Sequence, residues 1–266
     1  MNKKIEMNEW NPEQYLQFRS ERTQPAIDLV SRINIAHPES IIDIGCGPGN
    51  STQILVNRWP DSEVVGLDNS TTMIEKARQD YPGQKWIVSN AEDIDPNSKY
   101  DLIFSNATLQ WIPHHETLLP QLFECLNQGG AIAVQIPMFK NMPINVAIET
   151  VANYSKWTKY TKGCQELFTF RDMGFYYDIL NKLAKGVELW ESSYFHILNS
   201  QGSIIDFIRT TGLKPYLDHL PTYEMRSGFE QEVLTECKKY YKLQSNVCSP
   251  ETFGLIYPSS RHGKTE

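Results

Sequence analysis

Short apolar runs alternate with amphipathic stretches through the first half of the chain. The apolar runs, which predict strands, cover residues 41–44, 63–68, 85–88, 101–104 and 131–136. The stretches with helical spacing cover residues 25–33, 50–59, 71–81 and 115–126, with Pro25 at the start of the first and Asn50 or Ser51 as the cap of the second. Nearly continuous apolar strands separated by helices predict a parallel sheet with helices on both faces.

The pattern changes after residue 137. Residues 147–159, 203–211 and 223–241 have helical character, and residues 187–198 have strand character with several aromatic side chains. The whole chain therefore predicts an α/β, Rossmann-like fold with a mostly parallel sheet and helical cap insertions in the second half. In such a fold, ligands bind at the carboxyl ends of the strands.

A glycine-rich loop follows the first predicted strand and opens a helix. Gly45, Gly47 and Gly49 alternate with other residues, and Asp68 ends the next strand, 23 residues after Gly45. Glycines in that place let the backbone approach a ligand at a helix N-terminus. An acidic residue at the end of the second strand can accept both ribose hydroxyls of an adenosine. The two features together predict a site for an adenosine-containing ligand.

The spacing of the glycines distinguishes between two kinds of binding site for an adenosine-containing ligand. Dinucleotide sites favour G-x-G-x-x-G, whose third glycine allows close helix packing, but Asn50 stands at that position here. Asp43 precedes Gly45 by two residues, and the resulting Asp-x-Gly-x-Gly-x-Gly pattern is similar to the first motif of class I S-adenosylmethionine-dependent methyltransferases. An NAD-type oxidoreductase is the less favoured alternative. No Lys-Ser or Lys-Thr follows the glycines, so the phosphate loop of nucleotide triphosphatases is absent.

Motifs outside the glycine loop narrow the resemblance. They lie at residues 10–12, 15–26, 43–52, 66–74, 101–111, 176–180, 190–196 and 211–215. Together they resemble the trans-aconitate methyltransferase family, over roughly residues 8–244. The glycine motif alone indicates a methyltransferase, whereas the N-terminal and later motifs point to this family.

The resemblance implies S-adenosylmethionine as the cofactor, S-adenosylhomocysteine as its product, and no metal. By position, the cofactor residues are Asp43, Gly45, Gly47, Gly49, Asp68, Asn69, Met73, Ala91, Glu92, Asn106 and Ala107. Asp68 is placed at the ribose, and Asn106 and Ala107 near the sulfonium.

The resemblance also implies methyl transfer to a carboxylate of trans-aconitate, which gives a monomethyl ester. A carboxyl group with a pKa of about 4 is already ionised at pH 7, so the reaction needs no general base. The protein has to hold one carboxylate oxygen in line with the S–CH3 bond. A methyltransferase of another small metabolite, or a binding protein without activity, is also compatible with the sequence.

No catalytic side chain is required by this chemistry, only positioning, for which Gln110 and Trp111 are the candidates after the fourth strand. Arg22 is the first candidate anchor for a substrate carboxylate, because a guanidinium group matches a carboxylate with two parallel hydrogen bonds. The full set of expected substrate-binding residues is Arg22, Tyr15, Trp10, Gln110, Trp111, Tyr176, Tyr177 and His196.

Charge and cysteine content limit the partners. The 266 residues include 25 Lys plus Arg against 32 Asp plus Glu, a formal charge of −7. This balance disfavours nucleic acid and an anionic membrane surface. A small anionic carboxylic acid is the partner that the resemblance implies. The five cysteines show no C-x-x-C spacing, and no run is long enough to span a membrane, so we expect reduced thiols in a cytoplasmic monomer or weak oligomer.

The predicted organisation has four parts. Residues 1–24 form a lead-in over the active site, 25–137 the S-adenosylmethionine-binding core, and 138–245 a helical cap with a further strand. Residues 246–266 form a tail that is atypical of the family and partly disordered, in which only residues 253–257 have strand character.

Overall fold

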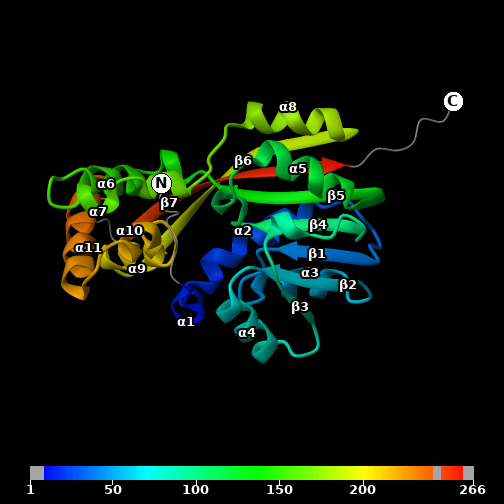
Figure 1. Cartoon of the computed structure of the whole chain (residues 1–266), viewed down its shortest axis with the longest axis horizontal. Helices are drawn as coiled ribbons and strands as arrows, with labels where there is room; N and C mark the ends of the chain where they lie inside the picture. The colour runs from blue at the N-terminus through cyan, green and yellow to red at the C-terminus, as the bar shows by residue number, and fades with distance from the viewer. Residues whose placement is uncertain (1–8, 242–246, 260–266) are drawn as a thin grey trace. The chain divides into compact units, whose positions relative to one another are not determined.

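The structure, a computed structural model, describes residues 9–241 and 247–259. Its strands form one sheet in the order β3-β2-β1-β4-β5-β7-β6 (Figure 1). The strands are β1 (Ser40–Ile44), β2 (Glu63–Asp68), β3 (Lys85–Val88), β4 (Tyr100–Asn106), β5 (Leu126–Pro137), β6 (Gly186–Leu198) and β7 (Val247–Ser259). Strands β1 to β5 pair in parallel, whereas β7 runs antiparallel to β5. The predicted α/β fold with a mostly parallel sheet is confirmed.

The helices connect these strands and form most of the second half. The α-helices are α1 (Pro12–Leu16), α2 (Arg19–Arg32), α3 (Asn50–Arg58), α4 (Thr71–Asp80), α5 (His115–Glu124), α6 (Pro143–Ala152), α7 (Thr158–Thr161), α8 (Met173–Leu183), α9 (Gly202–Arg209), α10 (Lys214–Asp218) and α11 (Tyr223–Cys237). The 3-10 turns are η1 (Ala91–Asp93), η2 (Leu109–Trp111), η3 (Phe139–Asn141) and η4 (Cys164–Leu167).

The chain divides into two compact units. The first unit contains Asn11–Pro137, Thr169–Ser192 and the chain from Phe253. The second unit contains Met138–Phe168 and Ser193–Thr252, together with Trp10. Residues 169–192, which the sequence places with the helical cap, thus belong to the first unit.

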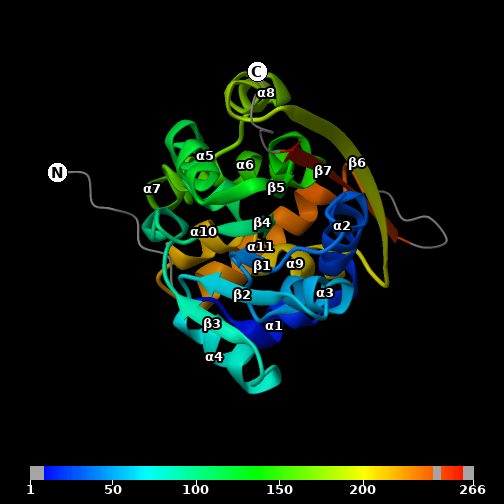
Figure 2. The ribbon, with the colours of Figure 1, turned by 90° about the vertical axis from the view of Figure 1, so that its right-hand side faces the viewer.

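Apolar side chains cover both faces of the parallel strands in the first unit. One cluster packs α5 and α8 against the sheet and includes Ile44, Ile103 and Leu122. The other packs α2 and α3 against the opposite face and includes Leu29 and Phe104. Figure 2 shows these helices on the two sides of the strands. The two layers leave the carboxyl ends of β1, β2 and β4 for the functional groups.

Helix α2 begins earlier than the sequence predicts. It starts at Arg19, so Pro25 lies inside the helix instead of opening it. A proline in that place removes one backbone hydrogen bond and crowds the preceding turn. Pro25, Ala26, Leu29 and Val30 are all buried, and this packing holds the helix across the proline.

Strand β5 also begins earlier, because the glycine pair Gly129-Gly130 lies within it. The pairing between β4 and β5 shifts register at this point, between Tyr100 and Leu102. Gly129 has a φ of +89°, and a Cβ on Gly130 would lie 3.0 Å from the carbonyl oxygen of Asp101. The pair therefore forms a bulge inside a strand that the sequence predicts only from residue 131.

The tail forms a longer strand than predicted. Strand β7 covers Val247–Ser259 and pairs with β5 from Pro137↔Phe253 to Ala131↔Ser259. Pro250 and Pro258, which flank the predicted strand of residues 253–257, both lie within it. The tail thus completes the sheet between β5 and β6. The predicted disorder after residue 259 falls outside the described residues.

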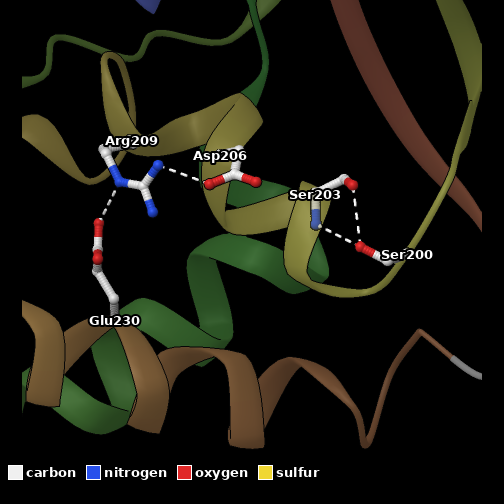
Figure 3. A network of polar contacts seen from close by, with 5 residues as sticks. All are labelled: Ser200, Ser203, Asp206, Arg209 and Glu230. Carbon is white, nitrogen blue, oxygen red and sulfur yellow. Dashed lines mark hydrogen bonds and ion pairs between the residues drawn. The ribbon is translucent and has the colours of Figure 1, made fainter.

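Polar contacts in the second unit join α9 to α11. Arg209 Nε donates to Glu230 Oε1 at 2.5 Å, and its Nη1 donates to Asp206 Oδ1 at 2.6 Å (Figure 3). Ser200 Oγ accepts the backbone N–H of Ser203 at 3.1 Å, which satisfies one donor in the first turn of α9.

Candidate active site

The loop between β1 and α3 holds three glycines in left-handed backbone conformations. Gly45, Gly47 and Gly49 have φ values of +70°, +54° and +94°. Residues with a Cβ adopt this conformation only at a cost. The N–H groups of Gly45 and Cys46 both donate to the carbonyl of Leu67, at 2.7 and 3.0 Å, and tie the loop to β2.

The space available to a Cβ differs among the three glycines. A Cβ on Gly45 would lie 2.1 Å from the side chain of Thr108, and one on Gly49 would lie 2.7 Å from Trp86. A Cβ on Gly47 would meet nothing within 4 Å. Gly45 and Gly49 therefore allow the loop to pack against the protein, whereas Gly47 leaves open space for a ligand.

Asp43 on β1 anchors the start of α3. Its side chain is buried, and Oδ2 accepts hydrogen bonds from Ser51 Oγ and Thr52 Oγ1, each at 2.7 Å. Burial raises the pKa of Asp43 to about 6, against the lowering effect of these two hydroxyls. The predicted cap at Asn50 or Ser51 is wrong, because Gly49 is the N-cap and Ser51 bonds to Asp43 instead.

Asp43→Asn is expected to stabilise the fold at neutral pH. Folding raises the pKa of Asp43 from 3.8 to about 6, so the free energy of unfolding falls as the pH rises through this window. At a pH above this window, the buried charge of Asp43 lowers the free energy of unfolding by about 3 kcal/mol. Asparagine can still accept from the two hydroxyls, but its NH2 group would take the place of Oδ1, which has no hydrogen-bond partner among the described residues. This unpaired group offsets part of the gain, so urea unfolding at pH 7 should show a net gain of up to about 2 kcal/mol.

The gain should be lost at low pH. Near pH 4 the wild-type carboxyl is protonated in the folded protein and partly protonated in the unfolded chain, so the variant loses most of its advantage there. An undiminished gain at pH 4 would contradict a titration of Asp43 as the cause.

Asp68 at the end of β2 faces the glycine loop. Its Oδ2 accepts the N–H of Gly47 at 2.9 Å, and its Oδ1 accepts the N–H of Ser70 at 2.8 Å. These two bonds hold the glycine loop and the start of α4 against the end of β2. Asp68 thus shapes the loop, and its role as an acceptor for ribose hydroxyls stays a prediction.

The predicted adenine-side residues lie around the ends of β2 and β3. Asn69 Nδ2 donates to Asn90 Oδ1 at 3.3 Å, and Met73 on α4 is buried. Ala91 is buried in η1, and Glu92 beside it is exposed. Their contact with an adenine stays a prediction.

A pocket opens beside the glycine loop. Its lining residues are Tyr15, Arg22, Thr23, Ala26, Gly45, Cys46, Gly47, Pro48, Asn50, Ser51 and Asn106. The guanidinium carbon of Arg22 lies 4.3 Å from the centroid of the Tyr15 ring, a cation–π contact. Among the described residues that line the pocket, Arg22 alone carries a charge. The structure therefore brings the N-terminal helices and the glycine loop into one site.

Several polar atoms of this pocket are buried. Thr23 Oγ1, Asn50 Nδ2 and Asn106 Oδ1 have no hydrogen-bond partner within residues 9–241 and 247–259. Each such group costs roughly 1–3 kcal/mol unless water or a ligand pairs with it. The set contains donors and acceptors beside the cation of Arg22, which suits a small ligand with polar groups of both kinds.

The turn after β4 is held in an unusual conformation. Ala107 has a φ of +53°, which is uncommon for a residue with a Cβ. Its N–H donates to the carbonyl of Gln135 at 3.0 Å, and its carbonyl accepts from Gln110 Nε2 at 2.7 Å. The Gln110 amide, predicted to position a substrate, thus also holds the turn that carries Asn106.

His115 and Tyr176 form a buried pair below η2. His115 Nε2 lies 2.8 Å from the carbonyl of Leu109, so Nε2 carries the proton, and Nδ1 accepts from the Tyr176 hydroxyl at 2.8 Å. Burial lowers the pKa of His115 and keeps the ring neutral. The hydroxyl of Tyr176 is bonded to His115 and supports the turn that carries Gln110 and Trp111, and its role in substrate binding stays a prediction.

The other predicted substrate residues are placed as follows. Trp111 is half-buried on η2, and Tyr177 is exposed on α8. Trp10 and His196 belong to the second unit, where Lys214 Nζ lies 5.4 Å from the Trp10 ring centroid. None of these four lines the pocket beside the glycine loop, and their roles stay predictions.

Sequence reasoning missed three polar residues at or beside this pocket. Thr23 follows Arg22 directly, and Asn50 was interpreted only as a cap and as the place of an absent glycine. Gln135 interrupts the apolar run of β5, and this interruption was a visible signal.

No described helix is long and apolar enough to cross a membrane. In the described part of the chain, no group of three or more His, Cys, Asp or Glu residues is arranged to hold a metal ion. The described cysteine side chains are buried, unbridged thiols, as predicted: Cys46, Cys125, Cys164 and Cys237. The side chain of Cys248 lies outside the described part.

Comparison with known proteins decides the family. Residues 41–130 match a methyltransferase domain family. The chain is 38% identical over 222 residues to the trans-aconitate 2-methyltransferase of Rhodopseudomonas palustris strain BisB5, which covers 83% of this chain and 87% of that protein. The chain belongs to the trans-aconitate 2-methyltransferase family. Another family member, from Variovorax paradoxus strain S110, is 39% identical over 242 residues, or 90% of this chain and 93% of that protein.

Solved structures agree with this family on the fold. Phosphoethanolamine N-methyltransferase 2 of Haemonchus contortus, in complex with S-adenosylmethionine, matches with a TM-score of 0.57 and 13% identity, over 94% of this chain and 57% of that one. The YcgJ protein of Bacillus subtilis matches with a TM-score of 0.55 and 13% identity, over 90% of this chain and 100% of that one. At these identities the likeness shows a shared methyltransferase fold only.

Proposed function

We propose that the protein transfers the methyl group of S-adenosylmethionine to a carboxylate of trans-aconitate and so forms a monomethyl ester. One observation carries the proposal: in a member of the trans-aconitate 2-methyltransferase family, the glycine loop, Arg22 and Asn106 line one pocket. Asp68 borders the same loop through its bond to Gly47.

The residues around the glycine loop fit S-adenosylmethionine. Gly47 leaves room for close approach, and Asp68 can accept the ribose hydroxyls. The buried polar atoms of Thr23, Asn50 and Asn106 suit its ammonium and carboxylate groups. When bound, S-adenosylmethionine supplies an electrophilic methyl group on its sulfonium.

The acceptor requires orientation and no base. Its carboxylates are ionised at pH 7, because their pKa values lie near 4. His115 is not available as a base, since both of its ring nitrogens are bonded inside the protein. Asp43 is buried against two hydroxyls. The contribution of the protein is therefore to hold one acceptor oxygen at the methyl group and to exclude water.

Cations and hydroxyls have to anchor the remaining carboxylates. Arg22 and Tyr15 offer both in the pocket, and Gln110 and Trp111 follow the turn after β4. The proposed set is completed, on the resemblance alone, by Trp10, Tyr176, Tyr177 and His196.

The test is transfer of labelled methyl from S-adenosylmethionine to a panel of small carboxylic acids. We expect trans-aconitate to give a monomethyl ester that alkali hydrolyses. If methyl is transferred only to a different acid, trans-aconitate is not the acceptor, but the protein is still a carboxyl methyltransferase. Absence of transfer to every acid, with intact binding of S-adenosylhomocysteine, would contradict the proposal.

Arg22→Ala is expected to lower kcat/KM for trans-aconitate at least about tenfold, and Arg22→Lys should recover little, because an ammonium lacks the two-pronged geometry. If Arg22 binds the acceptor, the KM for trans-aconitate rises and the Kd of S-adenosylhomocysteine does not change. If it binds the methionine carboxylate of the cofactor, this Kd rises as well.

Arg32→Ala is the matched control. Arg32 lies at the other end of α2, with its guanidinium 4.4 Å from the Trp190 ring centroid. Both substitutions remove a comparable cation–π contact, so equal losses of activity would mean that Arg22 acts only through stability.

A further inference from the structure

Gln135 is a buried amide in an otherwise apolar strand segment. It lies between Val134 and Ile136 on β5, and its relative exposure is 0%. Neither Oε1 nor Nε2 has a hydrogen-bond partner among the described residues. A buried amide without partners is costly, so its presence requires a ligand or an ordered water.

The sheet register places Gln135 beside the pocket. Gln135 on β5 pairs with Asn106 on β4, whose side chain lines the pocket. Because side chains alternate along a strand, Gln135 faces the same side as Ala133, which packs under α2. Thr23 and Ala26 of α2 line the pocket on this side.

The groups on this face favour a carboxylate. Thr23 Oγ1 and the guanidinium group of Arg22 are donors of residues that line the pocket, and Gln135 Nε2 adds a donor from the strand position paired with Asn106. Gln135 and Thr23 are not bonded to each other, so each needs a third group as a partner. A carboxylate accepts several hydrogen bonds at once and is stabilised by the adjacent cation.

We propose that Gln135 is a ligand-binding residue whose amide donates to a carboxylate held between β5 and the first turns of α2. Two carboxylates are available under the proposed function, on which this inference rests. One belongs to the methionine part of S-adenosylmethionine, and the other belongs to the acceptor acid. The chemistry is the same for both, and ligand binding distinguishes them.

The test uses Gln135→Met in the full chain. Methionine fills a similar volume without polar atoms, so the unliganded protein should keep or raise its melting temperature. Gln84→Met, in the turn between α4 and β3, is the control. Calorimetry measures binding of S-adenosylhomocysteine and of 5′-methylthioadenosine, which lacks the amino-acid end, and kinetics measures KM for trans-aconitate.

Two results support the inference. A rise in the Kd of S-adenosylhomocysteine of about tenfold or more, with 5′-methylthioadenosine unchanged, assigns Gln135 to the carboxylate of the cofactor. An unchanged Kd with a similar rise in KM assigns it to the acceptor. If Gln135→Met does not fold, Gln135→Asn, which keeps the amide but shortens its reach, should show the same loss.

A Gln135→Met variant in which neither the Kd of S-adenosylhomocysteine nor the KM for trans-aconitate changes overturns the inference. If the melting temperature of that variant also falls, the amide binds a structural water. The binding experiment does not depend on methyl transfer, so an inactive wild type that still binds S-adenosylhomocysteine would reject the proposed function and leave this inference testable.

Discussion

Asp68→Ala is expected to weaken binding of S-adenosylhomocysteine by about 30- to 150-fold, or about 2–3 kcal/mol. The substitution removes a charged acceptor for two ribose hydroxyls. It also removes the bond that holds the N–H of Gly47 at 2.9 Å, so the loop loses part of its shape. Isothermal titration calorimetry on the wild type and the variant measures the difference.

Asp68→Asn separates the two causes. Asparagine keeps one oxygen acceptor but loses the charge, and we expect an affinity between those of the wild type and Asp68→Ala. Unchanged affinity in a folded Asp68→Ala protein would contradict the assignment of the ribose site. Tight NAD binding by the wild type would instead favour an oxidoreductase.

Gly45→Ala is expected to lower the free energy of unfolding by about 2–5 kcal/mol. Its φ of +70° disfavours a Cβ, and that Cβ would lie 2.1 Å from Thr108. Thr108 cannot move without loss, since its Oγ1 bonds to the carbonyl of Gly45 at 3.2 Å. Chemical unfolding monitored by circular dichroism measures the change.

Gly47→Ala is the matched comparison, because it adds the same methyl group where no atom lies within 4 Å. The fold should lose only about 1–2 kcal/mol, from the left-handed backbone. Affinity for S-adenosylhomocysteine should fall about tenfold or more, because the methyl group occupies ligand space. Equal stability losses in both variants, with unchanged affinity in Gly47→Ala, would show that Gly47 has only a conformational role.

The site contains groups that reduce stability when no ligand is bound. Asp43 is ionised at pH 7 although burial raises its pKa to about 6, and the polar atoms of Thr23, Asn106 and Gln135 lack partners within the described chain. Ligand binding can satisfy some of these groups, so bound cofactor should raise the melting temperature. Stability and function therefore make opposite demands on the same residues.

The sequence by itself determined the parallel sheet, the glycine loop and the position of Asp68. These features depend on local signals: apolar runs of strand length, helical spacing, and the short distance between a loop and the end of the next strand. Neighbouring elements of a β-α-β unit pack together in one way, so local pattern predicts their geometry. The family resemblance followed from motifs that are likewise read along the chain.

Only the tertiary structure decided which distant residues meet. Arg22, predicted at the substrate, lies in the pocket of the glycine loop, and Tyr176 is bonded to His115, 61 residues away, below η2. The pairing of Gln135 with Asn106 depends on the register of β4 and β5, which a bulge at Gly129 shifts. Such contacts arise from packing across the sheet, and the spacing of residues along the chain does not encode them.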